Sequence, residues 1–344
     1  MQTLKRISDG AACKVHHTRN RYEIILPDGN RLLNEDILNG TILLILFTCT
    51  VSSLTTDRTA RKIAMEEPVI DRDPDSRPEK ILIPLANPDT VKDLVCLSMA
   101  VRDPHLSDNL YALSILYDTD NSKAVSTASR NLDNAARIAA SAHVDLKKLS
   151  RYDLNIASGI IHTVKEQEIT SLLIGLRRDA DSPILGNLAL NLLKSLSCEV
   201  LLSRLMVPIN TLSQIVVAVP PKAEYEAGFS RWVEHLCRLS TSLERPLHFH
   251  APQETIVILQ KLLEENSHRL EALYAPMEDY SDLTSLASEL DDDSLLAVVS
   301  SRPGSISHDS SFEKLPRLLG REFTSCSLIL LYPEKYDDSG QALS

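Results

Sequence analysis

The chain has 344 residues, of which 43% are hydrophobic and 24% charged, and this balance is that of a globular protein of about two domains. Its formal net charge of -11 excludes a dedicated nucleic-acid binder, because such a protein needs a concentrated basic face. The six cysteines form no CxxC pair and most lie in apolar runs, which is typical of the reducing cytosol.

An uncharged run, ILNGTILLILFTCTVSSLTT, covers residues 37–56. Spanning a bilayer takes about 20 apolar residues, so the run just reaches that length. Arg58, Arg61 and Lys62 follow it, and positive charge marks the cytoplasmic end of a membrane helix. We therefore predict a transmembrane helix over residues 37–56. The alternative is a buried core helix, which usually runs shorter and keeps a polar face.

Three segments flank the predicted elements. Residues 1–36 are expected to form an N-terminal segment outside the cytosol, or an artificial start. Residues 57–79 combine a basic juxtamembrane stretch with a linker that is rich in charge and proline. Residues 334–344 are expected to form a short tail.

Short apolar runs alternate with amphipathic stretches from Lys80 onward, and the whole order repeats after residue 213. The predicted strands are residues 80–86, 109–117, 144–153, 171–176 and 199–204, then 214–219, 246–251, 269–275, 294–301 and 326–332. The predicted helices are residues 89–101, 122–142, 155–168 and 185–196, then 224–240, 254–266, 282–290 and 312–321. This alternation predicts α/β folding with two tandem, doubly wound, five-stranded parallel sheets. The two domains are residues 80–207 and 214–333.

Pro84 does not fit the first predicted strand, because a central strand needs every backbone N–H and proline has none. We expect it to end the strand early or to mark a bulge.

Two parts of the sequence resemble known families. NEDILNGTILLILFTCTVSSLTTDRTARKIA, residues 34–64, resembles the last transmembrane helix of bacterial sodium/proton antiporters of the monovalent cation:proton antiporter family. Residues 80–207 and 214–333 resemble universal stress protein domains, with KILIPLANPDT similar to their opening strand.

The resemblance implies the C-terminal membrane helix and cytosolic regulatory or assembly region of a sodium:proton antiporter. The transport core would lie upstream and is not in this chain. The implied partners are the membrane, the antiporter's transport domain and a second copy in a homodimer. The implied location is the inner (cytoplasmic) membrane, with both α/β domains in the cytosol. Related stress proteins pair through their last strands, so EVLLSR and CSLILLY are expected to lie near each other.

The resemblance also points to a nucleotide site, because ATP-binding stress proteins carry a glycine loop of the form G-x2-G-x9-G-[ST] after the fourth strand. Here GLRRDADSPILGN keeps Gly175 and Gly186, but Arg178 stands at the middle glycine and Asn187 replaces the hydroxyl residue. Arg177 and Arg178 could bind a different anion. These five residues form a degenerate nucleotide or anion loop.

The same relatives carry an aspartate at the end of the first strand. Ala86 takes that position in the first domain and Pro220 in the second. Glycine permits close backbone approach to phosphates, and its loss together with the aspartate predicts weak or no ATP binding and no cofactor.

Other chemistry finds little support. His248 and His250 share one face of a predicted strand, but a metal site needs a third and fourth ligand, and none is visible nearby. The sequence contains no nucleophile elbow, HExxH or P-loop, so we predict no enzyme. The alternative function is a soluble universal stress protein that senses a nucleotide or another anion.

Overall fold

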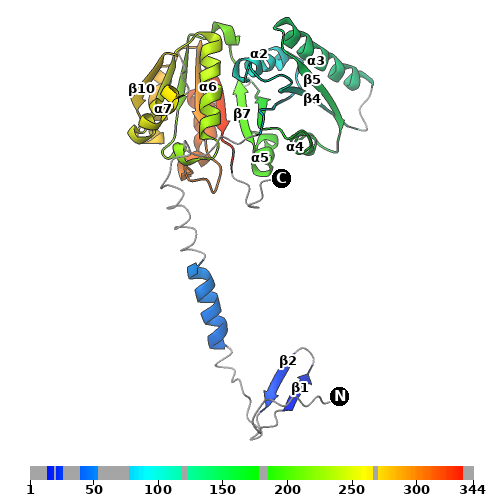
Figure 1. Ribbon diagram of the computed structural model, residues 1–344, viewed down its shortest axis with the longest axis vertical. Helices are drawn as coiled ribbons and strands as arrows, with labels where there is room; N and C mark the ends of the chain where they lie inside the picture. The colour runs from blue at the N-terminus through cyan, green and yellow to red at the C-terminus, as the bar shows by residue number, and fades with distance from the viewer. Residues whose placement is uncertain are drawn as a thin grey trace. The chain divides into compact units, whose positions relative to one another are not determined.

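The computed structural model describes residues 14–18, 21–25, 39–52, 77–117, 122–177, 185–265 and 270–335. The chain forms two compact units, Met1–Glu66 and Glu67–Ser344. In Figure 1 the colour runs from blue at the N-terminus to red at the C-terminus.

The first unit contains a small hairpin and a helix. Strands β1 (Lys14–Thr18) and β2 (Arg21–Ile25) pair in antiparallel fashion, and residues 39–52 are helical. The hydroxyl of Thr48 donates to the carbonyl of Leu44 at 2.9 Å, which satisfies a polar group on an otherwise apolar helix.

This helix falls within residues 37–56, where the sequence predicts a transmembrane span. Across the described parts of the chain, no helix combines the length and the apolar character that crossing a membrane requires. The transmembrane helix therefore stays a prediction.

The second unit is built on a ten-stranded sheet. Its strands in the first half are β3 (Ile81–Pro84), β4 (Leu110–Leu116), β5 (Leu146–Tyr152), β6 (Ser171–Gly175) and β7 (Glu199–Arg204). Those in the second half are β8 (Gln214–Ala218), β9 (Leu247–Ala251), β10 (Ala272–Pro276), β11 (Ser294–Val299) and β12 (Ser327–Tyr332). Pro84 is the last residue of β3, so it ends that strand early.

The helices connect these strands. They are α2 (Val91–Val101), α3 (Ser122–Ser141), α4 (Ile156–Gln167), α5 (Asn187–Ser195), α6 (Phe229–Leu243), α7 (Gln253–Glu265) and α8 (Leu315–Glu322). Short 3-10 helices are η2 (Pro88–Thr90), η3 (Ile209–Thr211), η4 (Ala223–Tyr225), η5 (Tyr280–Ser288) and η6 (Ser310–Glu313).

One predicted helix, over residues 282–290, needs correction. The structure has the 3-10 helix η5 there instead of an α-helix. Ser285 donates its hydroxyl to the carbonyl of Asp282, and Ser288 donates to that of Ser285. Serines within α2 and α3 form the same kind of bond, so these bonds do not by themselves set the geometry. The buried residues of this segment, Leu283 and Leu286, are three apart, and a 3-10 helix places that spacing on one face.

The two halves of the sheet have the same strand order. The full order is β10-β9-β8-β11-β12-β7-β6-β3-β4-β5, so each half places its first strand third and its last strand at the centre of the whole sheet. All neighbours are parallel except β7 and β12, which pair in antiparallel fashion with Leu202 opposite Leu330.

This central pairing confirms that EVLLSR and CSLILLY lie side by side, and it corrects the expectation of two separate five-stranded sheets. The two last strands are apolar and fully buried, so leaving either one as an edge would expose unpaired backbone groups. Their pairing removes both edges and makes one sheet of the two halves.

The hydrophobic core lies in two layers, one on each face of this sheet. One layer contains Ile81 and Ile83 and packs against α2, α3, α6 and α7; the other contains Leu82 and packs against α4, α5, η5 and α8. Alternate residues of the central strands enter opposite layers, as the period of two in a strand requires. Ile329 lies in the first layer and Leu330 in the second, so each layer runs through both halves.

Candidate functional site

The described residues of the predicted glycine loop lie at the carboxyl ends of the strands. Gly175 ends β6, Arg177 is exposed two residues later, and Asn187 begins α5 with Gly186 as its N-cap. Arg178 lies outside the described residues. The carboxyl edge is where open α/β sheets place ligands, so the position suits a site even though the motif is incomplete.

The two glycines differ in what surrounds them. A Cβ atom on Gly175 would lie 3.1 Å from Cδ1 of Leu94 in α2, so this glycine allows α2 to pack closely on the sheet. A Cβ atom on Gly186 would meet nothing within 4 Å. Gly175 therefore has a packing reason that requires no phosphate, while the space beside Gly186 is open.

A cavity of about 430 Å³ lies at the carboxyl ends of β3 and β4, beside the start of α3. Ala86 lines it, at the position where nucleotide-binding relatives carry an aspartate, and its polar walls include Ser114, Thr127 and Asn131. None of the described glycine-loop residues lines it.

Pro220 marks the equivalent position in the second half. Three residues further on, η4 begins, and its Glu224 is buried with the hydroxyl of Thr255 donating to Oε2 at 2.8 Å. Burial raises the pKa of the Glu224 carboxyl.

His248 and His250 both lie half-buried on β9, and burial lowers the pKa of His250. Within the described ranges no group of three or more candidate ligands that could hold a metal is found.

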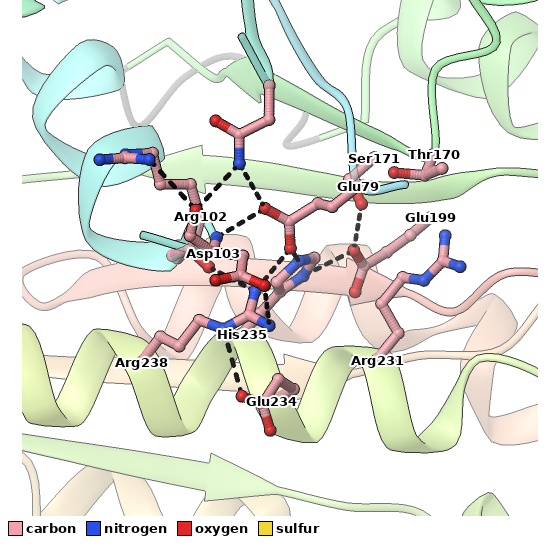
Figure 2. Close-up of polar contacts among 12 residues, drawn as sticks. Glu79, Arg102, Asp103, Thr170, Ser171, Glu199, Arg231, Glu234, His235 and Arg238 are labelled. Atoms are coloured by element: carbon pink, nitrogen blue, oxygen red, sulfur yellow. Dashed lines mark hydrogen bonds and ion pairs between the residues drawn. The ribbon is translucent and has the colours of Figure 1, made fainter. Parts of the chain in front are cut away.

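A second polar arrangement, absent from the sequence predictions, is a partly buried cluster at the junction of the two halves (Figure 2). Its centre is His235 on α6. Its two carboxylates come from the first half of the sheet. Glu79 lies two residues before the start of β3, and Glu199 is the first residue of β7. His235 and Glu199 are 0% and 1% exposed. We call Glu79, Glu199, His235 and Arg238 the interhalf cluster.

Helix α6 positions the imidazole through its periodicity. Four buried residues of the helix recur at three- and four-residue spacing: Trp232, His235, Leu236 and Leu239. The histidine therefore occupies the apolar face of the helix. Arg238 follows one turn later on the same side. The helix ends at Leu243, and Glu244 caps it in the left-handed region with φ 54°.

The distances within the interhalf cluster are short. Nε2 of His235 lies 3.1 Å from Oε2 of Glu79, and Nδ1 lies 2.8 Å from Oε2 of Glu199. Oε2 of Glu79 also accepts from Nη1 of Arg238 at 2.5 Å. The hydroxyl of Ser171 donates to Oε2 of Glu199 at 2.8 Å.

Backbone and amide groups complete the environment of Glu79. Its Oε1 accepts from the main-chain N–H of Asp103 at 2.7 Å and from the side-chain amide of Asn109 at 3.2 Å. Both donors lie between α2 and β4, so the first half itself fixes the orientation of this carboxylate. The second half then supplies the positive charges.

These contacts shift the pKa values in opposite directions. Burial alone would lower the pKa of His235, but the charges and hydrogen bonds of Glu199 and Glu79 raise it to about 9. Burial alone would raise the pKa of Glu79, but the hydrogen bond and charge of His235 and the charge of Arg238 lower it to about 2. The arrangement therefore favours the ionised forms of both groups.

The interhalf cluster lies at the amino ends of β3 and β7, opposite the edge where open α/β sheets bind ligands. No member lines the cavity at β3 and β4. Its chemistry is that of a buried, proton-binding ionic link. A weak signal for it is present in the sequence, since a histidine on an apolar helical face and a glutamate opening an apolar strand both need buried partners.

Comparison with known proteins agrees with the transporter resemblance in part. No protein-family model matches the chain. A stretch of 176 residues is 27% identical to the sodium/proton antiporter NhaS5 of Synechocystis, and the match covers 45% of this chain and 25% of that antiporter. The chain thus spans about a quarter of the length of this relative. It is a partial homologue of a sodium/proton antiporter.

Among solved structures, the cytoplasmic domain of a prokaryotic cation chloride cotransporter matches 76% of this chain and 98% of its own, with a TM-score of 0.51 and 12% identity. A universal stress protein from Archaeoglobus fulgidus matches 73% of this chain and 97% of its own, with a TM-score of 0.48 and 12% identity. At these identities the likeness concerns the fold, and the cotransporter domain shares the fold of the second unit.

Proposed function

We propose that residues 80–207 and 214–333 are the cytosolic regulatory and assembly region of a monovalent cation (sodium):proton antiporter. The observation that carries this proposal is the sequence match to a sodium/proton antiporter. The fold supports it, because a cytoplasmic domain of another ion transporter has the same architecture. The proposal assigns no enzymatic reaction and no ion conduction to this chain.

The proposal includes residues 37–56 as the last membrane helix, with the basic flank in the cytosol at the inner membrane. The described part of this segment supports it, because the helix over residues 39–52 exposes a continuous series of large apolar side chains from Ile42 to Phe47. An exposed apolar surface of that kind requires a nonaqueous partner. Homodimerisation would have to use a surface other than the last strands, which already pair with each other.

Membrane association is tested by fractionation. The full chain and a version that starts at Glu79 are expressed in bacteria, and membranes are washed at alkaline pH. We expect the full chain to stay with the membrane and the short version to be soluble. Leu44→Arg should weaken retention, since a charge at the centre of a span costs about 2.5–3.5 kcal/mol. Leu154→Arg, which changes an exposed leucine in the second unit, is the matched control. Release of the full chain by the wash would contradict the membrane helix.

The regulatory role is tested by exchange of segments. The part of the Synechocystis antiporter that matches this chain is replaced by this chain, and sodium-dependent proton movement is followed in everted vesicles. A deletion of the same part is the reference. We expect the replacement to restore exchange that the deletion impairs. A replacement that behaves like the deletion would count against the proposal. In a separate reconstitution, liposomes with this chain alone under a sodium gradient should show no more proton flux than empty liposomes.

A second candidate function is sensing of a nucleotide or another anion by a soluble stress-protein fold. The cavity at the carboxyl ends of β3 and β4 favours it, because that edge of the sheet is where this kind of fold binds ligands. The packing of Leu94 against Gly175 does not favour it, because it explains a retained glycine without a phosphate.

A further inference from the structure

The starting observation is that both nitrogens of His235 contact carboxylates. Nε2 is 3.1 Å from Glu79 and Nδ1 is 2.8 Å from Glu199. A neutral imidazole carries one N–H, so its second nitrogen would present a lone pair to a carboxylate oxygen. Only the imidazolium is attracted by its charge to both carboxylates: Nε2 hydrogen-bonds Glu79, and Nδ1 lies at ion-pair distance from Glu199 without hydrogen-bond geometry. The geometry of the site therefore matches the protonated ring.

The second observation is a need for positive charge around Glu199. Its Oε1 is buried and, among the residues that the structure describes, accepts no hydrogen bond. A buried carboxylate with an unsatisfied oxygen is costly unless a cation lies close to it. His235 is at ion-pair distance and lies in the other half of the sheet. The proton on His235 thus compensates a charge of the first half.

Three charged groups surround His235: Glu79 from the segment before β3, Glu199 from β7 and Arg238 from α6 itself. Glu79 and Glu199 carry two negative charges, and Arg238 on α6 supplies one positive charge to Glu79 at 2.5 Å. The remaining groups form the border of the cluster: Asp103 lies 3.8 Å and Glu234 3.2 Å from Arg238, and Arg231 lies 3.2 Å from Glu334. Without the proton on His235, Glu199 loses the positive charge that lies 2.8 Å from its Oε2.

We propose that His235 is a proton-dependent latch, which holds α6 of the second half against Glu79 and Glu199 of the first half and releases this contact as the pH rises. The latch itself depends only on the interhalf cluster. Its use as the signal of a regulatory region, with proton concentration as the quantity sensed, rests on the proposed function.

The direction of the effect follows from the raised pKa. His235 has a pKa of about 9 in the folded protein, against an ordinary value of 6.5. Below 6.5 both folded and unfolded chains hold the proton, so the latch contributes fully. Between 6.5 and about 9 the folded chain holds more protons than the unfolded chain, so stability falls as pH rises. Above that range the contribution is gone.

The first experiment measures urea unfolding of the full chain in detergent from pH 6 to pH 10. For the natural chain, the unfolding equilibrium constant should rise by roughly a hundredfold across this range through His235. His235→Gln should remove that rise. His162→Gln is the matched control, since His162 pairs with Asp153 at 3.0 Å but has a 55% exposed side chain. The control should keep the natural pH dependence.

The second experiment needs no variant and so remains decisive if His235→Gln does not fold. The full chain is labelled at its histidine rings and titrated by NMR. The latch requires one ring to remain protonated well above pH 6.5, and Glu199→Gln should lower the pKa of that same ring. If every ring titrates at or below about pH 6.5, the latch is wrong.

Hydrogen exchange locates the release. After correction for the intrinsic effect of pH, amides of α6 should lose protection between pH 7 and pH 9.5 by a larger factor than those of α7 in the same half, because α6 also opens locally. Equal losses in α6 and α7 would show that only the global stability changes and would overturn a local latch. None of these measurements involves transport, so failure of the latch is distinguishable from failure of the proposed function.

Discussion

Arg204 and Arg302 both stabilise the pairing of the two halves, because each arginine belongs to one half and donates to main-chain carbonyls of the other. Arg204 ends β7 and donates from Nη2 to the carbonyl of Phe323 in the second half. Arg302 follows β11 and donates to the carbonyls of Leu196 and Cys198 in the first half, at 2.6 Å and 2.7 Å. Both arginines are buried, so each satisfies main-chain acceptors that water does not reach.

The first prediction concerns Arg302. Arg302→Met keeps much of the volume but leaves the carbonyls of Leu196 and Cys198 without these donors, and we expect a loss of about 2–4 kcal/mol in unfolding free energy. Urea unfolding at pH 7 measures it. Arg317→Met changes an exposed arginine on α8 and should cost less than about 0.5 kcal/mol. Equal losses in both variants would show that the buried arginine has no special role.

The second prediction concerns acid stability. The pKa of Glu79 is about 2 against an ordinary 4.5, so its contribution is present above pH 4.5 and is lost as pH falls towards 2. Glu79→Gln should therefore be less stable than the natural chain by about 3 kcal/mol at pH 6, with a difference that shrinks below pH 4.5.

The comparison for this prediction is Glu166→Gln. Glu166 pairs with Arg151 at 2.6 Å, but its side chain is 60% exposed, and exposed ion pairs contribute about 0–1 kcal/mol. Unfolding by urea at pH 6, 4 and 3 resolves the two cases. A difference for Glu79→Gln that stayed constant across this range would rule out proton linkage.

The third prediction concerns Gly228, the N-cap of α6. A Cβ atom there would lie 2.7 Å from the backbone nitrogen of Glu334, which follows β12. Backbone cannot move aside as a flexible side chain can, so Gly228→Ala should cost about 1–3 kcal/mol. Gly186→Ala places a methyl group at another N-cap where nothing lies within 4 Å, and it should cost less than about 1 kcal/mol. Thermal unfolding of both variants provides the measurement.

The fourth prediction is that the chain binds ATP weakly, with a dissociation constant well above the micromolar range. Arg178 replaces a loop glycine, Ala86 and Pro220 replace the strand-end carboxylates, and each lost charged hydrogen bond removes about 1.5–3 kcal/mol of binding. Micromolar affinity corresponds to about 8 kcal/mol, so two losses move the dissociation constant towards millimolar. Titration calorimetry with ATP and magnesium is the test. A saturable micromolar isotherm would instead favour the sensor function.

Much of the second unit could be predicted because its strands are short, apolar and buried on both faces. The run SLLIGL predicted β6, and EVLLSR predicted β7. The 3-10 geometry of η5 could not be predicted in this way, because its apolar spacing also fits an α-helix and the two helices differ in backbone hydrogen bonding. Periodicity identifies the buried face of an element and does not resolve that difference.

The interhalf cluster was missed for a different reason. Glu79 was placed in the charged linker of residues 57–79, and His235 in an ordinary amphipathic helix. Their contact depends on the packing of α6 against the first half, which no local spacing encodes. By contrast, the glycine loop directly follows an apolar strand in the sequence, so the position of Gly175 at the end of β6 depends on no long-range contact.

The antiparallel pairing of β7 and β12 also sets a condition on biosynthesis. Residue 204 ends β7 and residue 327 begins β12, so the ribosome must add the whole second half before the outer edge of β7 can be covered. At ordinary rates of synthesis this takes roughly 6–25 s. During that interval the nascent chain presents an apolar strand edge that can pair with another molecule. Premature termination anywhere before β12 would make that exposure permanent, so incomplete chains of this protein should aggregate or be degraded.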